Sequence, residues 1–120
     1  MTNSIKLAPH YSLIFIADSG RGEIPERMDR PIVSTGSCIV VGCRADVDGE
    51  TEFTLGETHD VDPGDLPAFH GLLKTPNCRI VLHTAEDETI LQATVPQRET
   101  VVRIWVNHPS QPDRVIVGLG

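Results

Sequence analysis

The chain has 120 residues, 39% of them hydrophobic, which allows one domain with a substantial core but not two. Its formal net charge is −7 and its pI is near 5.0, whereas proteins that bind nucleic acid or anionic membranes non-specifically carry a basic face. The composition therefore disfavours nucleic acid and membrane as partners and leaves a basic protein or a metal ion.

The N-terminal segment and the cysteines indicate the compartment. No apolar run approaches the roughly 20 residues of a membrane helix, and the first residues lack a signal-peptide pattern. Cys38, Cys43 and Cys78 are an odd number of cysteines without C-x-x-C spacing, which is typical of free thiols. We expect a cytoplasmic protein in which Cys38 and Cys43, five positions apart, point to opposite faces of one strand.

The dominant pattern along the chain is an alternation of apolar and polar residues. It is clearest in SCIVVGCRADV, where the odd-numbered positions from Ile39 to Val47 are all apolar. The other segments with strand character are 10–18, 53–55, 80–83, 90–95, 101–107 and 114–120. Short strands separated by turn residues predict an all-β fold, an antiparallel β-sandwich of about seven to eight strands in a single domain, 1–120.

Two segments interrupt this pattern. DLPAFHGLLK, residues 65–74, has apolar residues at helical spacing and predicts the one short helix that the fold would contain. RGEIPERMDRP, residues 21–31, mixes charges with two prolines and predicts a surface connection.

The Asp48-Gly49 pair predicts a hairpin turn. A three-residue loop with Gly49 left-handed would pair Cys43 with Phe53 and keep both apolar faces on one side. Arg44 would then lie opposite Glu52. The same register gathers Asp46, Asp48 and Glu50 at an exposed acidic tip, which is either a solubilising hairpin end or a contact for a basic partner or a cation.

The segment THDVDPGD, residues 58–65, gathers a histidine and three carboxylates. It does not match a calcium loop, because the later ligand positions after Asp60 are occupied by glycine or by the wrong side chain. It is most simply a solvated loop. Two functional interpretations remain, a divalent-metal site made by His59, Asp60 and Asp62, or a partner-binding surface made by Asp60, Asp62 and Asp65.

The sequence contains no catalytic constellation. Its serines do not lie in a nucleophile motif, no phosphate-binding loop is present, and the five histidines are scattered over different expected elements. We therefore expect a protein that is not an enzyme and needs no cofactor. Trp105 is expected to pack on the sheet or beneath a loop.

Three stretches carry a resemblance to a known family. HYSLIFIAD, TGSCIVVGCRAD followed by FTLGE, and RETVVRIWVNHP with Trp105 occur in an order that resembles the competence protein J family of small acidic bacterial proteins. The resemblance spans most of the chain but includes no diagnostic motif. It implies an inhibitor of a cognate nuclease, a class of protein with a basic cleft that carboxylates can occupy.

The sequence thus favours a small acidic protein-binding module of the inhibitor or immunity type. Its expected partner-binding residues are the six carboxylates Asp46, Asp48, Glu50, Asp60, Asp62 and Asp65. The alternatives are a divalent-metal-binding protein that uses the His59–Asp62 loop and a structural subunit of a homo-oligomer with pairing edge strands.

Overall fold

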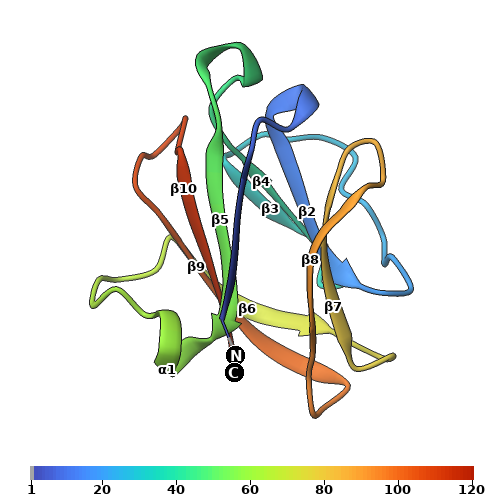
Figure 1. Ribbon diagram of the computed structural model, residues 1–120. Coiled ribbons are helices and arrows are strands. Elements are labelled where there is room, and N and C mark those ends of the chain that lie inside the picture. The colour runs from blue at the N-terminus through green and yellow to red at the C-terminus, as the bar shows by residue number, and fades with distance from the viewer. Residues whose placement is uncertain (1) are drawn as a thin grey trace.

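The computed structural model describes residues 2–120 and contains two β-sheets packed face to face (Figure 1). The strands are β1 (Asn3–Leu7), β2 (Leu13–Asp18), β3 (Ile32–Ser34), β4 (Cys38–Gly42), β5 (Thr51–Glu57), β6 (Phe69–Lys74), β7 (Arg79–Thr84), β8 (Thr89–Thr94), β9 (Glu99–Val106) and β10 (Arg114–Leu119). One α-helix in this part of the chain, α1 (Thr58–Val61), and two 3-10 turns, η1 (His10–Ser12) and η2 (Asp46–Asp48), complete the fold.

The first sheet has the strand order β1-β5-β10-β9-β6, and the second has the order β3-β4-β2-β7-β8. Neighbouring strands in the described chain are antiparallel except β5 and β10, which are parallel. The predicted all-β, mainly antiparallel sandwich is confirmed. The strand count exceeds the prediction because β1, β3 and β6 were missed, and all three are edge strands.

The core lies between the sheets and is built by alternate residues of the central strands. Ile14 and Ile16 of the second sheet and Phe53, Leu55 and Ile104 of the first are at most 1% exposed. Each such side chain contributes about 1.5–3 kcal/mol by leaving water, so this core is the main source of stability.

The second sheet also has an apolar outer face. Ala17, Cys38 and Val40 form a separate buried cluster there, with Leu13 and Phe15 packed against it. Cys43, in contrast, belongs to the central core. The prediction that Cys38 and Cys43 face opposite sides is confirmed, and both are free and buried.

The predicted hairpin at Asp48-Gly49 is wrong, because β4 and β5 belong to different sheets. The chain crosses the sandwich between them, so Cys43 and Phe53 both belong to the central core but are not partners along a ladder. The alternation identified the buried face of each strand but could not tell which sheet the strand joins. Arg44 consequently pairs with Asp113, at 3.4 Å, and Glu52 pairs with Arg114, at 3.5 Å.

The predicted helix over 65–74 is also wrong, since residues 69–74 form edge strand β6. Leu73 is fully buried and Phe69 packs partly on the core, and their spacing of four places them on one face of a strand as well as of a helix. The short helix lies instead at the start of THDVDPGD, in α1. The 21–31 segment is free of helix and strand, as predicted.

Asp18 ties the end of β2 to the turn between β6 and β7. Its side chain is almost fully buried and accepts hydrogen bonds from the backbone N–H of Gly20 (2.9 Å) and of Asn77 (2.9 Å) and from Asn77 Nδ2 (2.6 Å). Burial raises the pKa of this carboxyl, but the hydrogen bonds together outweigh burial and hold the pKa below the usual 3.8.

We expect Asp18→Asn to lower the free energy of unfolding by about 1–3 kcal/mol, because an amide group would face N–H donors that need an acceptor. Urea denaturation at neutral pH measures this loss. Asp29→Asn, which changes an exposed carboxylate, is the control. Equal midpoints for the two variants would contradict the role assigned to Asp18.

Candidate functional site

Four connections meet at one end of the sandwich, at the top of Figure 1. Leu7 lies opposite Thr51 and Arg114 lies beside Glu52, so the β1–β2, β4–β5 and β9–β10 connections share this end. Because β2 begins beside the ends of β4 and β7, the β7–β8 turn lies there too. We call residues 8–12, 43–50, 85–88 and 107–113 the acidic end.

The acidic end carries nearly all of the net charge. Its carboxylates are Asp46, Asp48, Glu50, Glu86, Asp87, Glu88 and Asp113. Within the four connections one arginine, Arg44, opposes these seven, so the segments hold a formal charge of −6 out of the total of −7. Cations of adjoining segments also reach this end: Arg21 pairs with Asp87 at 3.2 Å, and Lys6 and Arg114 lie beside Glu50 and Asp113. Sequence reasoning found Asp46, Asp48 and Glu50 but missed the other four, because they come from distant segments and meet only through the topology.

Arg44 links the β4–β5 and β9–β10 connections of the acidic end. Its guanidinium donates to the carbonyl oxygen of Asp48 and forms the ion pair with Asp113. Within η2, the N–H of Asp48 donates to the carbonyl of Ala45 (2.9 Å). A hydrogen bond from the Asn107 side chain, together with the nearby arginine, lowers the pKa of the Asp113 carboxyl and keeps it ionised. The carboxylates are therefore displayed by an ordered framework.

The other predicted carboxylates lie at the opposite end. Asp60 is in α1, and Asp62 and Asp65 are in the loop that follows it. The seven residues of β5 separate α1, and with it Asp60, from η2 by about 23 Å. The loop with Asp62 and Asp65 then runs back along β9, where the N–H of Ala68 donates to the carbonyl of Ile104. The structure therefore does not bring the two predicted acidic groups together.

Trp105 supports the loop that contains Asp62 and Asp65. It is 5% exposed, and its Nε1 donates to the carbonyl oxygen of Asp65 at 2.9 Å. A Cβ on Gly118, two residues beyond Ile116, the partner of Trp105 on β10, would lie 2.9 Å from the indole ring, so glycine makes room for the tryptophan. The prediction that Trp105 packs on the sheet beneath a loop is confirmed.

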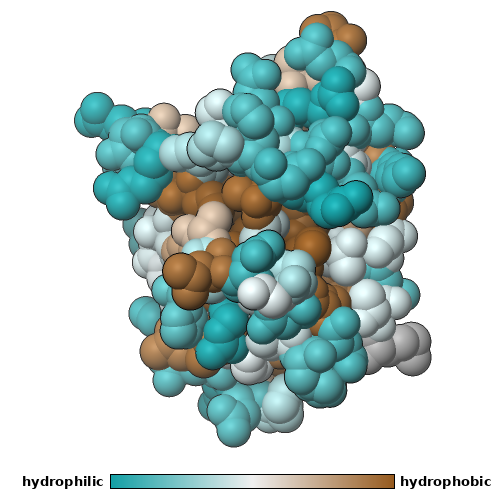
Figure 2. Space-filling view, turned by 90° about the vertical axis from the view of Figure 1, so that its left-hand side faces the viewer, coloured by the Kyte–Doolittle hydropathy of each residue, from teal (hydrophilic) through white to brown (hydrophobic). Residues whose placement is uncertain are grey.

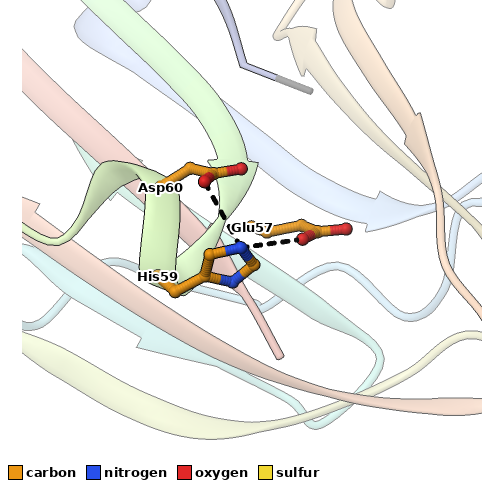
Figure 3. Close-up of side chains that lie close together, drawn as sticks. All are labelled: Glu57, His59 and Asp60. Atoms are coloured by element: carbon orange, nitrogen blue, oxygen red, sulfur yellow. Dashed lines mark ion pairs between the residues drawn. The ribbon is translucent and has the colours of Figure 1, made fainter.

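A compact group of possible metal ligands lies on α1 (Figure 3). His59 Nε2 is 3.4 Å from Glu57 Oε2 and 3.3 Å from Asp60 Oδ1, and all three side chains are exposed. Asp62 instead accepts a hydrogen bond from the N–H of Gly64 at 2.7 Å. Glu57 was not among the predicted ligands because it is the last residue of β5 and precedes the segment 58–65.

An open groove of about 1070 Å³ adjoins this group, and its lining includes Glu57, His59, Val95 and Pro96. The face of the molecule drawn in Figure 2 has hydrophobic side chains across its middle and hydrophilic side chains at its upper end.

No helix in residues 2–120 is long and apolar enough to cross a membrane.

The architecture is a two-sheet sandwich with its charge gathered at one end, and two solved structures share its fold. One is the crystal structure of ComJ, inhibitor of the DNA degrading activity of NucA, from Bacillus subtilis, with a TM-score of 0.64 and 13% identity over 98% of this chain and 93% of that one. The other, described as crocagin biosynthetic gene J, has a TM-score of 0.53 and 12% identity over 99% of this chain and 96% of that one.

These likenesses confirm the weak resemblance seen in the sequence and, at such low identity, establish a shared fold. No protein-family model matches the sequence. No curated protein matches it either.

His83 is a buried histidine that belongs neither to the acidic end nor to the group on α1. Its ring stacks on Phe15 with centroids 5.1 Å apart, and Nδ1 lies 3.1 Å from the carbonyl oxygen of Thr84. Burial lowers the pKa of His83, the contact with Thr84 opposes this effect, and the nearby Arg21 adds to the lowering while Asp87 opposes it.

The lowered pKa makes stability depend on pH. Below the usual histidine pKa of 6.5 the unfolded chain takes up a proton that folded His83 resists, so the free energy of unfolding falls as the pH drops from 6.5 toward the folded-state pKa. Urea denaturation across this range should give a shallower slope for His83→Gln than for the wild type. His70→Gln, at an exposed position on β6, is the control, and an unchanged slope in His83→Gln would contradict the assignment.

Proposed function

We propose that the protein is an inhibitor-type protein-binding module whose acidic end contacts a basic partner. The observation that carries this proposal is the concentration of a formal charge of −6 in four connections that meet at one end of the fold. The shared fold with ComJ, an inhibitor of a DNA-degrading activity, supports it. A nuclease binds polyphosphate through a basic surface, and an acidic surface of the same extent can occupy that site.

The physical properties of the acidic end suit this role. Carboxylates gathered on one face accelerate association with a basic protein at low salt. Because Arg44 and the turn hydrogen bonds already order η2, little conformational freedom is lost on binding. Asp60, Asp62 and Asp65 lie outside the four connections, on α1 and the loop that follows it, so we assign the contact to the acidic end.

The proposal implies binding without catalysis. The acidic end displays carboxylates and two histidines, His10 and His108, at the surface, and its role is electrostatic. The free cysteines, two of them buried, fit a reducing compartment, and we propose the cytoplasm as the site of action.

A second candidate function is divalent-metal binding at α1, favoured by the convergence of Glu57, His59 and Asp60. Their ligand atoms all lie within 4.8 Å of one another. Such a mixed oxygen and nitrogen set suits Zn²⁺ or Mn²⁺. A third candidate, a homo-oligomer joined through the sheet edges, would be recognised by light scattering.

The main proposal predicts a partner that the acidic end retains. In a pull-down from lysate of the native cell, the wild-type protein should retain a basic protein that moderate salt elutes, because screening weakens exposed charge pairs. The Asp46→Ser/Asp48→Ser/Glu50→Ser variant should lose it. Addition of the wild-type protein should reduce any DNA-degrading activity in the eluate.

The matched control is Asp60→Ser/Asp62→Ser/Asp65→Ser, which removes the same charge from the opposite end and should retain the partner. Equal loss of the partner from both triple variants would show that only net charge matters. Full retention by both would show that neither set of carboxylates is needed. Either result would reject the acidic end as the contact. Recovery of the protein alone would favour the homo-oligomer.

The metal candidate makes a separate prediction. Millimolar Zn²⁺ or Mn²⁺ should raise the Tm of the wild type, because an ion bound by the folded state stabilises it, and should leave the Tm of His59→Ala unchanged. An equal shift in both proteins would exclude the group on α1.

A further inference from the structure

The acidic end carries two large, exposed apolar side chains. Tyr11 is 76% exposed on η1, and Val47 is 88% exposed on η2. The two turns are in contact, and the backbone N–H of Cys43 donates to the carbonyl of Ser12 at 2.9 Å. Tyr11 and Val47 are therefore carried by two adjacent turns, and we refer to them together as the patch.

The patch is enclosed by carboxylates. Asp46 and Asp48 flank Val47 in the sequence, and both belong to the same turn. Beside Tyr11, His10 Nδ1 lies 2.8 Å from Glu86 Oε1, which places the acidic β7–β8 turn against η1. Two apolar groups thus lie within a negatively charged rim.

Tyr11 is displayed at a conformational cost. Its φ is 64° and that of Ser12 is 56°, in the left-handed region that non-glycine residues rarely adopt. A bulky side chain there is strained, and with 76% exposure Tyr11 gains little packing within the chain to offset the strain. The backbone holds the ring outward in solvent.

We propose that Tyr11 and Val47 are the apolar anchors of the acidic end, and that they enter an apolar depression rimmed by lysine or arginine on the partner. This inference rests on the proposed function. Interfaces derive most of their affinity from a few central side chains, among which tyrosine is enriched, while rim charges set association rate and orientation. Tyr11 is the principal anchor, and Val47 extends the surface that it buries.

Charge favours this pair over the other exposed apolar residues. The other exposed apolar residues of the segment 2–120 all lie outside the four connections: Ile24, Met28, Leu66 and Leu72. Outside the four connections the charges nearly cancel, leaving a formal charge of −1. Tyr11 and Val47 are the exposed apolar pair that a basic partner would meet when steered to the acidic end.

Two labelled peptides of equal length and charge test the proposal. One contains lysine and serine, and the other replaces its central serines with leucine. Fluorescence anisotropy gives the Kd of each for the wild-type protein at two salt concentrations. We expect the leucine peptide to bind about tenfold more tightly, with a ratio that survives added salt because apolar burial is not screened while both affinities fall.

The variant Tyr11→Asn/Val47→Ser should abolish this ratio and leave the serine peptide's affinity unchanged. Asparagine tolerates the left-handed backbone at position 11, and circular dichroism checks the fold. Leu66→Ser, at a similarly exposed site outside the acidic end, should keep the ratio. A ratio near one in the wild type, or one that persists in Tyr11→Asn/Val47→Ser, would overturn the anchor proposal alone.

Failure of the proposed function has a different signature. If the Asp46→Ser/Asp48→Ser/Glu50→Ser variant bound the serine peptide as tightly as the wild type does, or if neither peptide bound, the acidic end would not recognise cations. The anchor proposal would then fall with it.

Discussion

The mutual burial of two sheet faces is the constraint on which the rest of this structure depends. Neither sheet can exist alone in water with Ile14, Phe53 and Ile104 facing outward, so the sheets must pack together. Once they do, connections between antiparallel neighbours lie at one end or the other, whereas the β2–β3 and β5–β6 connections run along the sandwich from one end toward the other. The convergence of the four acidic connections is a consequence of that packing.

Gathering seven carboxylates costs repulsion, which the structure limits without removing. The side chains are spread over separate turns in water and salt, where interactions between exposed charges are screened. Arg44 and Asn107 interact with Asp113, and His10 interacts with Glu86. Arg21 also pairs with Asp87. What remains is a net negative field at one end of the scaffold, which a partner of opposite charge can neutralise.

Sequence patterns revealed what depends on local alternation and missed what depends on long-range topology. The all-β class, the opposite directions of Cys38 and Cys43 and the burial of Trp105 followed from period two and residue type. Strands β1, β3 and β6 lie at sheet edges, where partial exposure weakens the alternation. The Asp48-Gly49 turn resembled a hairpin because a strand carries no mark of the sheet that it joins.

The same limit applies to the candidate site. The carboxylates Asp46, Asp48 and Glu50 were recognisable as a cluster because they lie within five positions of the sequence. Glu86 and Asp113 were not, because nothing local relates them to η2 before the strands are ordered. Tyr11 looked like part of an apolar strand, HYSLIFIAD, and only the turn η1 places it outside that strand.

The position of β10 has a consequence for how the chain folds. This last strand lies between β5 and β9, in the centre of the first sheet, with a parallel partner on one side and an antiparallel partner on the other. Until residues 114–119 are available, β1 and β5 have no connection by backbone hydrogen bonds to β9 and β6. During synthesis the first sheet exists as two separate strand pairs with exposed edges, and it closes in a late step dominated by non-local contacts, which are slow to form.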